Sequence, residues 1–256
     1  AVYNSVMARA DVVIANSKWT AELIASRHPF AADRIVTISR GTDFSAFNRS
    51  AIAPERIDQL RQKWGIGKDQ IVFLHLARLT HWKGQKFVIE AARHVVPTHA
   101  NARFVLAGDA QGRDDYVSGL KKRAVELGLQ DHIILPGHCD DPAAAMAMAD
   151  IVVVASIEAE AFGRAAVEAG ALGKPVLVTQ IGAVTETVRA EPEYSGHEIS
   201  GWKVEPGNAE EMGAVMNDAL SMSLQDREKI GRQALQFVTE HFSLDQMCNK
   251  TLAEYR

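Results

Sequence analysis

Apolar and polar positions along this chain alternate in a pattern that predicts strands and helices in turn. Between residues 69 and 222, short apolar runs rich in β-branched side chains are separated by longer segments with helical periodicity. The expected strands are 71–76, 104–107, 132–135, 151–155, 175–179 and 201–204. The expected helices are 85–96, 114–128, 142–149, 162–172, 184–190 and 209–220. Strands that alternate with amphipathic helices predict a doubly wound α/β domain, whose parallel sheet is covered on both faces.

The start of the chain departs from this regular pattern. A strand expected at 11–15 leads through a polar break into a helical segment, and a second short strand is expected at 34–38. A single βα unit cannot bury both faces of its strand. We therefore expect residues 1–38 to be the remnant of an N-terminal domain that is otherwise missing. Residues 39–68 then form a linker and a first helix that begins near Pro54.

The end of the chain, residues 223–256, is expected to form two helices with no strand between them. These helices follow the main domain of residues 69–222 and must pack elsewhere. We expect several of their apolar positions to lie partly uncovered, and a large exposed apolar patch usually marks an interface. We therefore expect either dimerisation through these helices or a shift in the position of a helix. The apolar positions are Leu235, Phe237, Val238, Phe242 and Met247.

Composition narrows the class of protein without naming a function. The chain has 256 residues, a net charge of −4 and 47% hydrophobic residues, which is typical of a soluble globular protein. No basic block favours nucleic acid. Cys139 and Cys248 lie far apart and the nine histidines do not cluster, so neither a disulfide framework nor a metal site is expected. No apolar run is long enough for a transmembrane helix or a signal peptide, which favours a cytoplasmic location.

Two cations follow the first strand of the main domain, where ligands of parallel sheets bind. Arg78 and Lys83 lie in one loop before a helix, and together they can neutralise a diphosphate. The alternative is a solvent-exposed loop, because Lys and Arg are mostly surface residues. An acidic loop after a later strand favours the interpretation that Arg78 and Lys83 belong to a binding site.

That acidic loop follows the fourth strand of the main domain. Glu160 and Glu168 bracket Phe162 and Gly163. The glycine lets a ligand approach backbone N–H groups at a helix N-terminus, which favours a phosphate. Carboxylates accept hydrogen bonds from hydroxyls, so they suit a sugar and a ribose. For Glu168 the alternative is a helix-surface carboxylate without a partner.

The loop after the third strand contains Gly137, Cys139 and a pair of aspartates, Asp140 and Asp141, ahead of a helix. One aspartate is expected to cap this helix. The other could reach the edge of a nucleobase, where a carboxylate would suit guanine. No Gly-Lys-Ser/Thr follows the glycines at 108–112, which excludes a nucleoside triphosphatase with a Walker loop.

Taken together, these residues resemble the C-terminal half of a retaining glycosyltransferase of the GT-B fold, in the large family usually numbered four. The resemblance covers nearly the whole chain, and its motifs are 10–17, 40–43, 78–85, 108–109, 137, 149–150, 160–163 with Glu168, 173–176 and 206–207.

This resemblance implies a Rossmann-like domain that binds a nucleotide-sugar donor. Arg78 and Lys83 would hold the diphosphate and stabilise the leaving group in place of a metal ion. Glu168 would bind the ribose and Glu160 the donor sugar, while the N–H groups of residues 162–164 (Phe162, Gly163 and Arg164) would face sugar hydroxyls or phosphate. The acceptor would be bound by the missing N-terminal domain, to which the C-terminal helices would cross back.

A narrower resemblance, to the lipopolysaccharide-core mannosyltransferases of α-proteobacteria, rests on residues 80–85, 112–116, 137–139 and 162–164. It implies GDP-mannose as the donor, with UDP- and ADP-sugars as alternatives. Gly137, Cys139 and Asp141 would then contact the donor, with Asp141 at the base. Mannose or glucose would pass with retention to a glycan or lipopolysaccharide core, and the full-length protein could contact the inner membrane peripherally. Arg40 replaces the Asn that is common in the linker of the wider family.

Two other classes of protein would share this fold. One is a non-catalytic module that binds a nucleotide sugar for regulation, because its binding residues would look the same. The other is an epimerase of the same architecture, which would need a different set of acidic groups. The resemblance to half of a glycosyltransferase further implies that this chain alone binds a donor but does not transfer its sugar.

Overall fold

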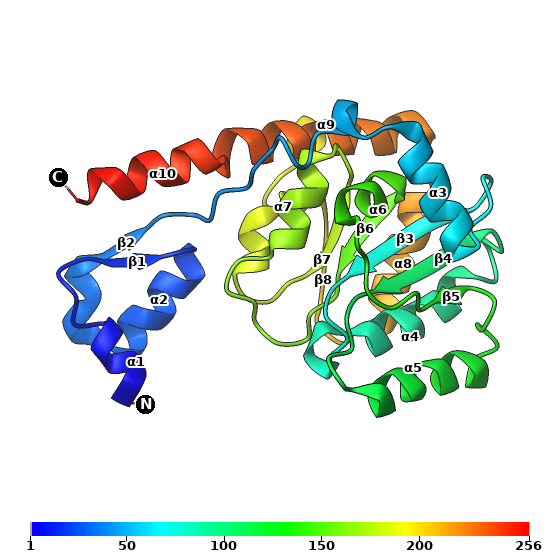
Figure 1. Cartoon of the computed structure of the whole chain (residues 1–256), viewed down its shortest axis with the longest axis horizontal. Helices are drawn as coiled ribbons and strands as arrows, with labels where there is room; N and C mark the ends of the chain where they lie inside the picture. The colour runs from blue at the N-terminus through cyan, green and yellow to red at the C-terminus, as the bar shows by residue number, and fades with distance from the viewer. Residues whose placement is uncertain (1, 256) are drawn as a thin grey trace.

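A six-stranded parallel sheet forms the centre of the molecule, and a smaller two-stranded unit stands beside it (Figure 1). The computed structural model describes residues 2–255. The order of the large sheet is β5-β4-β3-β6-β7-β8. Its strands are β3 (Ile71–Leu76), β4 (Ala102–Ala107), β5 (Ile133–Ile134), β6 (Ile151–Val154), β7 (Val176–Thr179) and β8 (Gly201–Val204).

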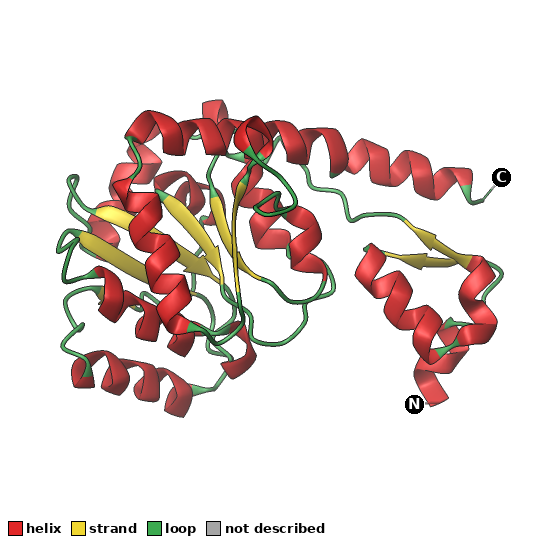
Figure 2. Cartoon of the chain, turned by 180° about the vertical axis from the view of Figure 1, so that it is seen from behind, coloured by secondary structure: helices red, strands yellow, loops and turns green. Residues whose placement is uncertain are grey.

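Helices cover both faces of this sheet (Figure 2). They are α3 (Pro54–Trp64), α4 (Gln85–Val95), α5 (Asp114–Glu126), α6 (Pro142–Met148), α7 (Arg164–Ala171) and α8 (Ala209–Ser221). The chain leaves β3 toward β4 and β5 on one side and returns to β6 on the other, so the strand order reverses between β3 and β6. Ligands of open α/β sheets bind at such a point.

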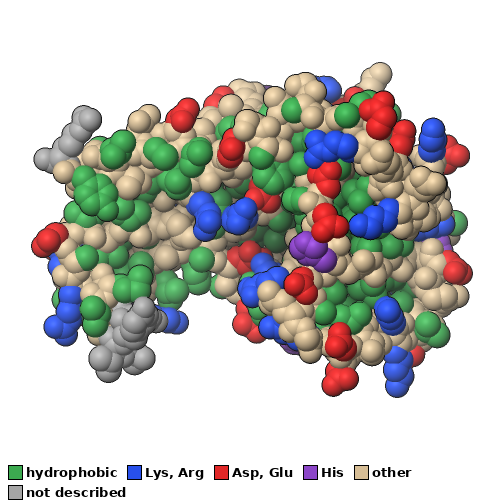
Figure 3. Space-filling model, viewed as in Figure 1, with side chains coloured by type: hydrophobic (Ala, Val, Ile, Leu, Met, Phe, Trp, Pro, Cys, Tyr) green, Lys and Arg blue, Asp and Glu red, His purple; other side chains and the backbone are tan. Residues whose placement is uncertain are grey.

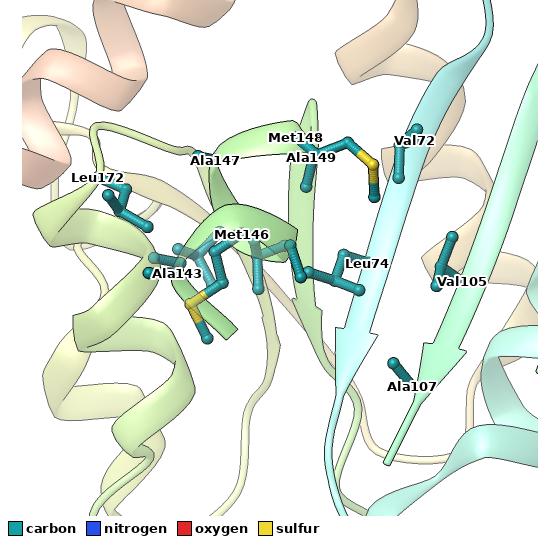
Figure 4. Close-up of a cluster of buried hydrophobic side chains, with 14 of the residues drawn as sticks. Val72, Leu74, Val105, Ala107, Ala143, Met146, Ala147, Met148, Ala149 and Leu172 are labelled. Carbon is teal, nitrogen blue, oxygen red and sulfur yellow. The ribbon is translucent and has the colours of Figure 1, made fainter. Parts of the chain in front are cut away.

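The core has two halves because successive side chains of a strand point to opposite faces. Leu74 packs with Met146 and other residues of α6 on one face (Figure 4). On the other face Phe73 stacks on Phe104, with ring centroids 5.0 Å apart, beneath α4 and α8. Each face excludes water from one set of alternate strand residues, which explains the continuous apolar runs in the sequence. We call this body, residues 54–221, the sheet domain.

The first part of the chain forms a separate unit, which we call the N-terminal unit, residues 2–38. It contains α1 (Val2–Met7), β1 (Val13–Ala15), α2 (Lys18–Arg27), a 3₁₀ helix η1 (Pro29–Arg34) and β2 (Ile35–Thr37). β1 and β2 pair in parallel. Two strands cannot bury both of their faces, and Ile14 of β1 remains 41% exposed.

The last two helices, α9 (Leu224–His241) and α10 (Leu244–Ala253), follow each other without a strand, as predicted. The prediction that their apolar positions lie uncovered is wrong for three residues. Phe237, Val238 and Phe242 are buried against Phe162 and α7, because α9 packs on the sheet domain of its own chain. Leu235 is exposed as predicted.

The α10 helix extends from the sheet domain toward the N-terminal unit (Figures 1 and 2). The linker runs against the start of this helix, where the N–H of Thr42 donates to the carbonyl of Phe242 at 2.8 Å. The N–H of Gly41 donates to the sulfur of Met247 at 3.1 Å. No residue of α10 is buried.

The prediction of a helix at residues 184–190 is also wrong. The structure has a five-residue 3₁₀ helix there, η4 (Ala183–Thr187), and the chain is extended from Val188. This segment is rich in β-branched residues, which fit an α-helix poorly. Two of them use their hydroxyls instead: Thr187 donates to the carbonyl of Val184 at 2.7 Å, and Thr185 donates to that of Gly182 at 2.9 Å. These local bonds replace the longer helix.

Replacing Phe237 with Ala is expected to destabilise the protein by about 3 kcal/mol, because the change leaves a cavity in a packed aromatic cluster. Leu235→Ala on the same helix is the control, and we expect its effect to stay within about 0.5 kcal/mol. Urea unfolding of both variants measures the difference. Equal losses in the two variants would mean that α9 does not pack on the sheet domain as described.

Candidate functional site

The carboxyl ends of β3 and β6 open into a cavity of about 580 Å³. In the space-filling view the surface is open between the N-terminal unit and the sheet domain (Figure 3). The cavity is lined by Asn16 of the N-terminal unit and Arg40 of the linker on one side, and by the strand-end loops of the sheet domain on the other. Seven of the residues predicted for the site line it together: Arg78, Lys83, Glu160, Phe162, Gly163, Arg164 and Glu168.

The cationic and acidic loops meet directly in this cavity. The ammonium of Lys83 lies 2.6 Å from a carboxylate oxygen of Glu160, and both side chains are largely buried. The hydroxyl of Ser156 donates to the same carboxylate. Lys83 also stands over the ring of Trp82, 4.2 Å from its centroid. Carboxylate, hydroxyl and ring together fix the position of the ammonium at the cavity wall.

Backbone contacts hold these two loops at a fixed separation. The N–H of Ile157 donates to the carbonyl of Trp82 at 2.8 Å. Gly84 has φ of +77°, and a Cβ there would lie 1.9 Å from the carbonyl oxygen of Ala155. Any other residue would force the loops apart, so glycine at this position is what allows Lys83 to reach Glu160.

Glu168 lies on the second turn of α7 and points into the cavity from a buried position. Its side chain is 11% exposed, and one carboxylate oxygen accepts a 2.8 Å hydrogen bond from the guanidinium of Arg164, one turn earlier. Burial raises the pKa of Glu168, and the charges of Arg164 and Arg40 only partly oppose this effect. A buried carboxylate beside an exposed guanidinium can exchange that partner for the hydroxyls of a ligand.

The α7 helix begins at Arg164 because Gly163 takes a left-handed conformation with φ of +92°. A Cβ on Gly163 would lie 2.7 Å from a methyl carbon of Val184. Residues 163–165 at the start of α7 line the cavity, and a helix N-terminus favours a negative group.

Three other predicted residues lie outside the lining of the cavity. Asp141 caps α6 by accepting from the N–H of Ala144, and both of its carboxylate oxygens bind the guanidinium of Arg56, at 2.8 and 2.9 Å. This guanidinium holds the pKa of Asp141 below its usual value. Asp141 is therefore the aspartate that caps the helix. The cap and the base contact were expected from different aspartates, but Asp141 is also the residue expected at the base.

Gly137 and Cys139 have structural partners of their own. The carbonyl of Gly137 accepts from the N–H of Gly108 at 2.8 Å, which joins the loops after β4 and β5. The thiol of Cys139 is half-buried against α6, and burial raises its pKa. Neither residue is among those that surround the cavity. Both cysteines are free.

The sequence analysis missed His75, a buried histidine in the cavity wall. Its Nδ1–H donates to the carbonyl of Val153 at 2.8 Å, and its Nε2 has no partner among the described residues. Burial lowers the pKa of His75, which favours the neutral ring. The available signal was a single histidine inside the otherwise apolar run 71–76. Asn16 and Arg40 were missed as lining residues because they come from segments distant in sequence.

The charges of the cavity suit an anion that carries hydroxyls. Four cationic side chains and two carboxylates line it, which leaves an excess of two positive charges. Arg78 and Arg40 form no ion pair with any residue between 2 and 255, so these guanidinium groups remain available to a ligand. Within the same range, no group of three potential ligands is placed to hold a metal ion.

Known proteins with similar sequences are glycosyltransferases. The family model described as "Glycosyl transferases group 1" matches residues 56–237, which is more than half of the chain. The uncharacterized glycosyltransferase MJ1607 of Methanocaldococcus jannaschii is 30% identical over 246 residues, which cover 95% of this chain and 59% of that protein.

Two solved structures share this fold. A glycosyltransferase from Rickettsia africae has a TM-score of 0.87 and 29% identity, over 99% of this chain and 65% of its own. Anabaena Alr3699/HepE in complex with UDP-glucose has a TM-score of 0.85 and 29% identity, over 99% of this chain and 66% of its own. This likeness confirms the predicted α/β fold of the GT-B type. The chain spans less than two thirds of the length of these relatives.

Glu168→Gln is expected to stabilise the protein at neutral pH. The folded state raises the pKa of Glu168, so ionising it costs more in the folded than in the unfolded chain. This cost is absent below the unfolded pKa of about 4.3 and is complete once the pH exceeds the folded pKa. Thermal unfolding should therefore show a gain for the variant at pH 7 that shrinks toward pH 4.

The exposed Glu158→Gln serves as the control for this pH series, and its melting temperature should follow that of the unchanged protein at every pH. A loss of stability in Glu168→Gln at pH 7 would instead show that the ion pair with Arg164 outweighs the cost of burial.

Proposed function

The chain belongs to the group 1 glycosyl transferases, and we propose that it forms the half of such an enzyme that binds the nucleotide-sugar donor. The observation that supports this proposal most directly is the cavity between β3 and β6, where an excess of positive charge stands beside a buried carboxylate. A nucleoside diphosphate sugar combines the two groups that this cavity matches, a diphosphate and vicinal hydroxyls.

In this proposal Arg78 and Lys83 bind the diphosphate. Arg78 offers a forked guanidinium, and Lys83 a point charge that Glu160 and Trp82 already hold in place. As the bond to the sugar breaks, negative charge grows on the departing diphosphate, and fixed cations stabilise that charge more than the ground state. The cations thereby do the work that a metal ion does in other transferases, and we propose a metal-independent reaction.

Glu168 and Glu160 bind hydroxyls in this proposal. The buried carboxylate of Glu168 accepts from the ribose diol, and Arg164 turns from it toward solvent or phosphate. Glu160 faces the sugar while it keeps Lys83 as its partner. The N–H groups of residues 162–164 (Phe162, Gly163 and Arg164) then meet the phosphate or the sugar hydroxyls.

The sugar we propose is a hexose, mannose or glucose, transferred with retention. GDP-mannose is the first candidate on the motifs at residues 80–85 and 162–164, and UDP- and ADP-sugars are the alternatives. The complex of Anabaena HepE with UDP-glucose supports a nucleotide-sugar donor without deciding the base. Asp141 can reach a guanine only if its carboxylate also leaves Arg56, so the proposed base contact depends on that exchange.

We propose a glycan or lipopolysaccharide core as the acceptor, bound by a further part of the enzyme such as the relatives contain beyond the matched region. A cytoplasmic enzyme in peripheral contact with the inner membrane would meet such an acceptor. Among residues 2–255, no helix is long and apolar enough to cross a membrane. A dimer through the C-terminal helices would use α10 and the exposed Leu235 of α9, because the aromatic residues at the end of α9 are buried.

Calorimetric titration of the chain with UDP, GDP, ADP and pyrophosphate tests this proposal. We expect at least one nucleotide to bind, and Arg78→Met and Lys83→Ala each to weaken both nucleotide and pyrophosphate by about tenfold or more, because each loses a charge-assisted contact. Glu168→Ala should weaken the nucleotide but not pyrophosphate, since it loses only the ribose contact.

Arg232→Met, which removes an exposed guanidinium on α9 away from the cavity, is the matched control and should bind unchanged. If no nucleotide binds, or if the cavity variants bind like the control, the site is wrong. A non-catalytic nucleotide-sugar module is the alternative function. It predicts the same titration, and it would gain support if a longer form of the protein that contains an acceptor domain transferred no sugar.

A further inference from the structure

The N-terminus of α2 is capped by a residue that lies far away in sequence. The N–H groups of Lys18 and Trp19 donate to the two carboxylate oxygens of Glu186, at 3.0 and 2.7 Å. Ser17 caps the same helix locally by accepting from the N–H of Thr20. Glu186 belongs to η4 of the sheet domain, so this carboxylate joins the N-terminal unit to the sheet domain.

This contact is favourable for two reasons. It satisfies two N–H groups at the start of a helix that would otherwise lack an intrahelical partner. It also places a negative charge at the positive end of the helix dipole. A half-buried carboxylate with both oxygens bound in this way fixes the direction of the helix as well as its distance.

The same short segment supports the acidic loop of the cavity. The N–H of Ala183 donates to the carbonyl of Glu160 at 2.9 Å, and Gly182 forms a bridge with Glu160. Val184 lies against Gly163 at the start of α7. Within six residues, η4 and Gly182 before it therefore contact both the wall of the cavity and the N-terminal unit.

The N-terminal unit contributes Asn16 to the cavity, at the position just before the cap of α2. Its Oδ1 is buried and has no hydrogen-bond partner among the residues from 2 to 255. A buried amide oxygen without a partner is costly, and a ligand hydroxyl or N–H would satisfy it. Where Asn16 stands depends on where α2 is held. The hydroxyl of Thr20, which donates to the carbonyl of Ala161 at 3.3 Å, adds a second contact between α2 and the acidic loop.

We propose that Glu186 is a positioning residue that seats the N-terminal unit on η4, so that Asn16 completes the wall of the donor cavity. Glu186 does not line that cavity itself. It acts through the helix N-terminus, and Asn16 is the group that meets the ligand. The consequence for binding rests on the proposed function, whereas the contact between the two bodies does not.

The first test is amide hydrogen exchange on the whole chain. Glu186→Ala should speed exchange at the N–H groups of Lys18 and Trp19 by about tenfold, as expected for the loss of a helix cap. Glu186→Gln keeps one acceptor oxygen and should give a smaller increase. The control is Glu198→Ala, an exposed carboxylate in the next 3₁₀ helix, which should leave both amides unchanged. Unchanged exchange in Glu186→Ala would overturn the proposal.

The second test measures affinity for UDP-glucose and GDP-mannose in a double-mutant cycle. Glu186→Ala and Asn16→Ala should each weaken binding of the nucleotide sugar by about three- to tenfold, and the two together by no more than either alone, because they remove one contact. Additive losses would show that Glu186 does not act through Asn16. If the unchanged chain binds neither of these donors nor an ADP-sugar, the proposed function fails, and the exchange experiment still decides the role of Glu186.

Discussion

Each strand of a parallel sheet must leave at the same edge, and the site of this protein depends on that constraint. The loops after β3 and β6 are separated by about seventy residues of chain, yet they emerge side by side because the two strands are neighbours. Arg78 and Lys83 thereby face Glu160 and Glu168 across one cavity. The helices and the two halves of the core hold these strands in place and exclude water from both faces of the sheet. Lys83 would not lie near Glu160 without the pairing of β3 with β6.

The charged side chains at that edge form two ion pairs and leave an excess of positive charge. Lys83 neutralises Glu160 and Arg164 neutralises Glu168, so neither buried carboxylate stands alone. Arg78 and Arg40 remain without an ion pair among residues 2–255. A ligand with two negative charges balances this excess, and in the proposed complex only the pair of Arg164 with Glu168 opens to admit the ribose. The free-energy cost of burying these charged groups therefore arises when the protein folds and not when a ligand binds, which is the condition for a preorganised site.

Sequence predicted the parts of this protein that depend on local pattern. The strands were predictable because each is a short apolar run, and the site loops because polar residues follow those runs at one edge. Contacts between distant segments were not predictable. No pattern in the sequence near Asp141 indicates its ion pair with Arg56. No pattern in α9 indicates that Phe237 is buried against α7 of the same chain. The 3₁₀ helix at residues 183–187 was mistaken for an α-helix because periodicity alone does not register the preference of Val and Thr side chains for other conformations.

The contact of Gly84 with Ala155 also determines where this scaffold can change. A single added methyl group would meet a carbonyl oxygen of the neighbouring loop, so the loops that carry Lys83 and Glu160 tolerate almost no variation at their meeting point. The loop after β4 meets the same limit, because a Cβ on Gly108 would lie 1.8 Å from the carbonyl oxygen of Ala77 in the loop after β3. A protein engineer who wished to alter the ligand would keep Gly84 and Gly108 and vary residues of these loops away from the two close approaches. Natural variants meet the same restriction, because no residue with a side chain leaves room for the neighbouring carbonyl oxygen at either position.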